Sequence, residues 1–191
     1  RFGTAPGTEE FWALLGRTRT GAARIEAYGR AIERRPCYPW AYFLRGLARL
    51  EQGELEPAIA DFDTALRMNQ RLSEAYLGRA QAWSQKGDRE RAIGNYSWAL
   101  RFNPQCPYAH YGRAQERAAA GEDAQAIADL EEVTKIAPGY AEAYDERGRL
   151  RAKGGDVAGA VQDWRRALEV ASAGWSRRAE VARRIAEAGG K

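Results

Sequence analysis

Four arginines recur in this chain at one constant interval, and each has a polar counterpart at a fixed distance further along the sequence. The arginines are Arg45, Arg79, Arg113 and Arg147, and their counterparts are Asp61, Asn95, Asp129 and Asp163. A guanidinium binds phosphate or carboxylate through two parallel hydrogen bonds, so such a column could serve an anionic ligand or an internal ion pair. Because three of the four counterparts are carboxylates at one fixed offset, the spacing favours internal pairs. Arg79, which faces only an amide, is the best candidate for the phosphate alternative.

These arginines belong to a unit that is repeated four times without insertion or deletion. The units span residues 39–72, 73–106, 107–140 and 141–174. Positions 8, 20 and 27 of each unit are small, whereas positions 4, 21, 24 and mostly 28 are large. Spacings of three and four residues indicate helix faces, and small residues on both faces let two antiparallel helices approach closely. Glycine at position 15, followed by Glu or Asp, predicts where the first helix ends and the second begins.

This pattern resembles the tetratricopeptide repeat family, whose unit is about 34 residues long, with an aromatic at position 4, small residues at 8, 20 and 27, and proline near 32. The resemblance implies an all-α fold, a right-handed superhelical solenoid of antiparallel helix pairs. Residues 1–38 are expected to hold a degenerate first repeat: Tyr28, Ala31 and Pro36 fit its second helix, but Trp12 stands where a small residue belongs.

The segment 175–191 follows the last unit and is expected to be a capping helix and tail. Its apolar face would consist of Trp175, Ala179, Ala182 and Ala186. That face would cover the last repeat, and the arginines of the segment, Arg177 and Arg184 among them, would face solvent.

The resemblance also implies a concave groove that binds a partner peptide or domain, lined by positions 2, 5, 9, 12 and 13 of each first helix. We therefore expect a protein–protein interaction scaffold without catalysis. The candidate binding residues are Trp40, Phe43, Leu47, Leu77, Gln81, Gln85, Tyr108, Tyr111, Gln115, Asp145 and Arg149. For Trp40 and Phe43, packing onto the degenerate first repeat is an equally supported alternative.

The remaining residues that invite a chemical role have structural explanations. His110 occupies the aromatic packing column, so we expect an interior histidine rather than a catalytic base. Neither a cofactor nor a metal site is expected, since one histidine and two cysteines do not make a zinc ligand set. Cys37 and Cys106 lie almost two repeat lengths apart in the sequence and are expected to be free thiols. Trp98 stands at a position that normally faces solvent and could form a second contact surface.

Two rival functions stay open at this stage. The first is binding of single-stranded nucleic acid through arginines and aromatics. The net charge of +4 is only a weak pointer to it, and the mixed signs along every helix, outside the arginines of the C-terminal cap, disfavour it. The second is self-association, through Trp98 or the N-terminal end. The sequence has no membrane-spanning run. Since it begins without Met, we interpret it as a piece of a longer protein, and we expect a cytoplasmic location.

Overall fold

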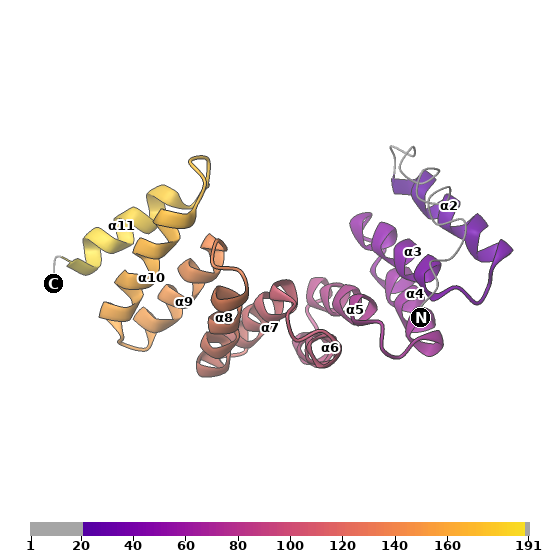
Figure 1. Ribbon diagram of the computed structural model, residues 1–191, viewed down its shortest axis with the longest axis horizontal. Helices are drawn as coiled ribbons and strands as arrows, with labels where there is room; N and C mark the ends of the chain where they lie inside the picture. Colours follow the sequence, from indigo (N-terminus) through magenta and orange to yellow (C-terminus); the bar gives the residue numbers. More distant parts are fainter. Residues whose placement is uncertain (1–20, 190–191) are drawn as a thin grey trace. The chain divides into compact units, whose positions relative to one another are not determined.

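The computed structural model describes residues 21–189, which form ten α-helices and no strand (Figure 1). The helices are α2 (Gly21–Arg34), α3 (Pro39–Glu51), α4 (Leu55–Met68), α5 (Ser73–Gln85), α6 (Arg89–Phe102), α7 (Pro107–Ala119), α8 (Asp123–Ile136), α9 (Ala141–Lys153), α10 (Val157–Val170) and α11 (Arg178–Gly189). The all-α prediction is confirmed. No helix in this part of the chain is both long and apolar enough to span a lipid bilayer.

The chain divides into two compact units, the first ending at Phe102 and the second beginning at Asn103. Helices α2 to α6 lie in the first unit and α7 to α11 in the second. Within each unit, the two helices of every repeat pack against each other, and the second helix of one repeat packs on the first helix of the next. The predicted first helix of the degenerate repeat, which holds Trp12, lies outside the described residues.

The turn inside each repeat is set by the predicted glycine. Gly53, Gly87, Gly121 and Gly155 all have φ between 76° and 90°, a left-handed conformation that glycine adopts without steric cost. The following acid then caps the second helix only where it is an aspartate: Asp88 accepts from the amide of Arg91 at 3.1 Å, and Asp156 from that of Gly159 at 2.9 Å. Glu54 and Glu122 make no such side-chain bond.

The size of the residue at position 8 is matched to the residue at position 24 on the facing helix. Phe62 is completely buried between Gly46 and Gly78, and a Cβ on either glycine would lie 2.7 or 2.6 Å from its ring. Trp164 in the second unit lies equally close to Gly148, at 2.6 Å. Phe62 and Trp164 therefore fill space that a side chain on the facing helix would occupy.

The described part of the first repeat is α2, which packs on the first complete repeat. Tyr28 of α2 is buried and joins the core formed by Phe43, Leu44 and Phe62. Arg24 of the same helix forms an ion pair with Glu51 of α3. The helix α2 thus covers the first complete repeat as the second helix of a repeat would.

The apolar face predicted for the C-terminal helix is confirmed for Trp175, which packs against the core of α10, and is wrong for its three alanines. The chain first turns, so that α11 begins at Arg178 rather than at Trp175. Val181 is completely buried against α10, with Ile185 and Ala188 beside it. The alanines predicted to pack, Ala179, Ala182 and Ala186, are all exposed. Burial of the larger aliphatic side chains removes more apolar surface from water than burial of the alanines would, and this decides which face packs.

Candidate partner-binding surface and the arginine clusters behind it

The predicted arginine–aspartate pairs are confirmed, and each aspartate holds a second arginine as well. In the first complete repeat, Nε and Nη2 of Arg45 donate to the two carboxylate oxygens of Asp61 at 2.9 and 2.7 Å. Arg49, one helical turn later, donates to the same carboxylate at 2.8 Å. One buried carboxylate therefore ties two points of the first helix to the second helix.

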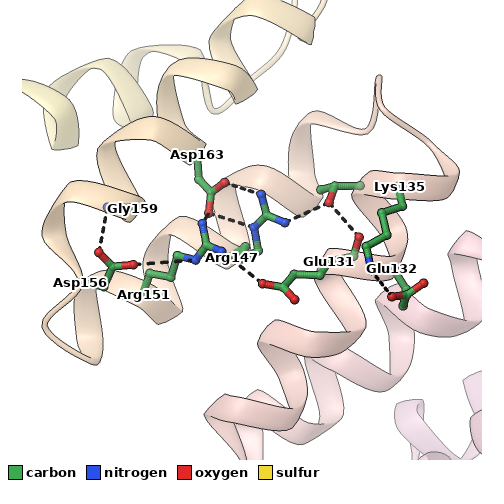
Figure 2. A network of polar contacts seen from close by, with 9 residues as sticks. Glu131, Glu132, Lys135, Arg147, Arg151, Asp156, Gly159 and Asp163 are labelled. Atoms are coloured by element: carbon green, nitrogen blue, oxygen red, sulfur yellow. Dashed lines mark hydrogen bonds and ion pairs between the residues drawn. The ribbon is translucent and has the colours of Figure 1, made fainter.

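The same cluster returns twice in the second unit. Arg113 and Arg117 meet on Asp129, and Arg147 and Arg151 meet on Asp163. Figure 2 shows both guanidiniums of the last repeat directed at Asp163, with Arg151 also reaching Glu131 of the preceding repeat at 3.2 Å. The second arginine column, at position 11, was missed in the sequence. Its constant offset from the aspartate was the available signal.

The second repeat departs from this arrangement in both columns at once. Where the other repeats have arginine at position 11 and aspartate at position 23, it has Trp83 and Asn95. Arg79 donates to Asn95 at 2.6 Å and also pairs with Asp63 of the preceding repeat. Arg79, the best candidate for binding phosphate, is thus already neutralised by a carboxylate. Trp83 is covered by the guanidinium of Arg91, 4.4 Å from the ring centroid.

Asp129 illustrates the electrostatics of these clusters. Burial raises the pKa of its carboxyl, but hydrogen bonds from His110 and Arg113 and the charge of Arg117 outweigh burial, so the pKa lies below its usual value. His110 is buried, with Nδ1 3.4 Å from Asp129 and Nε2 3.0 Å from the carbonyl oxygen of Pro104. The prediction of an interior histidine is confirmed.

The candidate residues of the first unit fall into two groups. Phe43 is buried, and Trp40 packs edge-on against it with ring centroids 5.4 Å apart, both as part of the core that contains Tyr28. Packing onto the first repeat therefore accounts for both aromatics, and Phe43 has almost no surface to offer. The half-buried leucines Leu47 and Leu77 and the exposed amides Gln81 and Gln85 keep accessible surface.

The second unit brings three tyrosines together. Tyr108 on α7 is 65% exposed, and its ring lies 6.4 Å from that of Tyr140, which in turn lies 5.0 Å from Tyr111. Burial raises the pKa of Tyr111 to about 12. Tyr108 and Tyr140, with Pro107, Ala137 and Gly139, line an open hollow of about 300 Å³. Gln115 is exposed further along α7.

Tyr140 was not among the candidates, because it precedes α9 and so lies outside the helix positions that were considered. One signal in the sequence could have identified it: Tyr140 is aromatic, whereas the same position holds Leu72 and Cys106 in the two preceding repeats.

Asp145 and Arg149, the candidates in the last repeat, are placed differently from one another. Asp145 is completely buried and binds Arg177 at 3.1 Å and Arg184 at 2.6 Å, both from the C-terminal segment. Its carboxylate is therefore not accessible to a partner. Arg184 was expected to face solvent, but it binds this carboxylate instead. Arg149 is exposed and paired with Glu146.

The remaining features that the sequence analysis considered are a metal site, the two cysteines and Trp98. In the described part of the chain, no group of three or more His, Cys, Asp or Glu side chains could hold a metal ion. Cys37 and Cys106 are free thiols, as predicted. Trp98 is 44% exposed, stacks on Tyr76 and Phe102, and is covered by Arg101, so the prediction of an exposed tryptophan is confirmed.

Comparisons with known proteins agree on the fold. A family profile described as tetratricopeptide repeat matches residues 8–73, 43–88 and 77–141. Among solved structures, MamA matches with a TM-score of 0.75 at 22% identity over 88% of this chain and 96% of its own. YrrB, described as a TPR protein with an unusual peptide-binding site, matches with a TM-score of 0.74 at 18% identity over 95% of this chain and 92% of its own. A thermophilic TPR protein of Thermus thermophilus matches with a TM-score of 0.67 at 23% identity over 93% of this chain and 95% of its own. A search of curated protein sequences gave no significant match.

Proposed function

Because the chain belongs to the tetratricopeptide repeat family, we propose that it is a protein-interaction scaffold whose second unit binds a peptide segment of its partner. The binding surface in this proposal is the tyrosine face, which we define as Tyr108, Tyr111, Gln115 and Tyr140. The observation that carries the proposal is the exposure of Tyr108 above an open, mostly apolar hollow. Tyrosine offers a large apolar ring and a hydroxyl at low entropic cost, which explains its frequency in binding sites.

The arginine clusters support this surface without being part of it. Asp129 ties α7 to α8, and Asp163 ties α9 to α10, so the helices that flank the tyrosine face are each fixed to their partner helix. A pre-ordered surface binds more tightly, because less conformational freedom is lost when the ligand arrives. The proposal assigns no reaction to the chain.

Binding of nucleic acid is the weaker alternative. The recurring arginines at positions 7 and 11 donate to carboxylates or to Asn95, so they have little capacity left for phosphate groups. The proposal therefore keeps nucleic acid only as an outcome that the experiment below can detect.

Site-directed photo-crosslinking in the source lysate tests the proposal. A photoreactive residue replaces Gln115 on the tyrosine face, and the same residue replaces the exposed Gln125 on α8 as the matched control. We expect a protein crosslinked from position 115 that is absent from position 125 and is lost when Tyr108→Ala is added. Equal crosslinking from both positions, or a crosslinked species sensitive to nuclease, would contradict the proposed site.

A further inference from the structure

Cations of the chain itself lie over many of its aromatic rings. Arginines cover Tyr42, Tyr76, Tyr144, Trp83 and Trp98, with the guanidinium carbon 4.4 to 5.6 Å from the ring centroid. Among the described residues, no lysine or arginine lies over Tyr108, Tyr111 or Tyr140 in this way. The exposed ring of Tyr108 therefore keeps the negative electrostatic potential of its face for a cation from outside.

A carboxylate without a counter-charge lies beside this cluster. Glu142, two residues after Tyr140, accepts a hydrogen bond from the neutral indole of Trp175 at 3.0 Å. Within residues 21–189, no cationic side chain forms an ion pair with it. The neighbouring acids differ in this respect, because Asp145 is bound by Arg177 and Arg184, and Glu146 by Arg149.

The charge of Glu142 reaches Tyr140 and Tyr111. Burial is the main cause that raises the pKa of Tyr140, and Glu142 is the next. Glu142 also contributes to the raised pKa of Tyr111, after burial, Tyr140 and Glu146, and against the positive charge of Arg177. The hollow itself is lined only by uncharged residues. Aromatic faces, an uncharged hollow and one unpaired carboxylate complement a side chain with an apolar stem and a cationic head.

We propose that the tyrosine face binds an arginine side chain of the partner peptide, with the guanidinium stacked on Tyr108 and with Glu142 as its counter-charge. Arginine fits better than lysine, because its planar and weakly hydrated head stacks on rings and can bond a carboxylate with two N–H groups. Its methylene stem would lie along Pro107 and Ala137. This inference rests on the proposed function and adds the chemistry of the ligand.

Selection of peptides from a random displayed library, with the full chain as bait, tests the inference without knowledge of the natural partner. We expect selected peptides to be enriched in arginine at one position. Replacing that arginine by citrulline, which keeps the shape and removes the charge, should weaken binding about 10-fold, or about 1.4 kcal/mol.

Variants of the chain identify the site. Glu142→Gln keeps the acceptor for Trp175 and should weaken the arginine peptide about 10-fold while leaving the citrulline peptide nearly unchanged. Tyr108→Ala should weaken the arginine peptide, and Tyr108→Phe should not. Glu187→Gln, an exposed acid on α11, is the matched control and should have no effect. Circular dichroism of each variant verifies that it is folded.

The outcomes separate the inference from the function on which it rests. Peptides that depend on Tyr108 but show no preference for arginine, or a preference for proline or acidic residues, would overturn the arginine site and leave the peptide-binding function standing. Arginine-rich peptides insensitive to both Tyr108→Ala and Glu142→Gln would also overturn it. Failure to select any peptide would contradict both.

Discussion

The substitution Asp129→Asn should reveal how strongly the arginine clusters hold the helix pairs together. Asp129 accepts three bonds of 2.6 to 2.9 Å from Arg113 and Arg117. Asparagine offers one oxygen in place of two and turns an NH₂ group toward a guanidinium. Loss of a hydrogen bond to a charged group costs about 1.5–3 kcal/mol, and removal of one partner from a deeply buried ion pair about 3–5 kcal/mol.

Partial access of water to the arginines reduces the cost expected for a deeply buried ion pair. The side chains of Arg113 and Arg117 keep 16% and 21% of their surface exposed, so water can solvate part of the freed charge. We therefore expect Asp129→Asn to lower the free energy of unfolding by about 2–3 kcal/mol. Equilibrium urea denaturation, monitored by far-ultraviolet circular dichroism, measures this change in the free energy of unfolding. The control is Glu169→Gln at an exposed ion pair, which should stay within about 0.5 kcal/mol of the native chain.

The second repeat supplies the decisive second variant. It already combines asparagine at position 23 with tryptophan at position 11, in Asn95 and Trp83. Adding Arg117→Trp to Asp129→Asn removes the guanidinium left without its carboxylate, so the double variant should be more stable than Asp129→Asn alone by about 1 kcal/mol. The reasoning fails if the double variant is the less stable of the two, or if Asp129→Asn alone changes stability by under about 0.5 kcal/mol.

Three other predictions concern packing, titration and the C-terminal helix. Gly78→Ala should cost about 1–3 kcal/mol, because its Cβ would lie 2.6 Å from the ring of Phe62, and Phe62→Leu in the same chain should recover part of that loss in urea denaturation. Burial raises the pKa of Tyr111 to about 12, so folding favours its neutral form; the resulting contribution to the free energy of unfolding is complete below about pH 10 and is lost as the pH rises toward 12. The difference in absorbance at about 295 nm between the native chain and Tyr111→Phe should show Tyr111 ionising only near pH 12. Ionisation near pH 10 would contradict its burial. Asp145→Asn should speed hydrogen exchange of α11 amides about 10-fold without affecting α8, since the carboxylate holds Arg177 and Arg184; unchanged exchange in α11 would mean that Val181 alone holds the helix.

The repeat itself is predictable from the sequence because its signals are local and occur four times. The glycine after each first helix has to adopt positive φ, and all four do. The constant offset between Arg45 and Asp61 predicts a contact between helices, because an antiparallel pair joined by a tight turn brings those positions opposite each other.

The features that were missed occur only once or depend on competition between residues. The cluster at Tyr140 exists in one repeat, so no column of residues points to it. Asp145 fits a position expected to be exposed, but the C-terminal segment covers it, and the contact depends on where the chain turns before α11. The packed face of α11 follows from competition between Val181 and the alanines, which the helical period alone does not decide.

The matching of residues inside each repeat limits how such a chain can grow or be rearranged. Phe62 requires both Gly46 of its own repeat and Gly78 of the next, while Trp83 occurs together with Asn95. An exchange that joined α7 to α4 would place the methyl group of Ala114 against the ring of Phe62, and one that joined α3 to α6 would place Arg45 and Arg49 opposite the amide of Asn95. For these repeats, the unit that can be duplicated without a mismatch is therefore the intact helix pair, which in the first complete repeat must be followed by a helix with glycine in the place of Gly78.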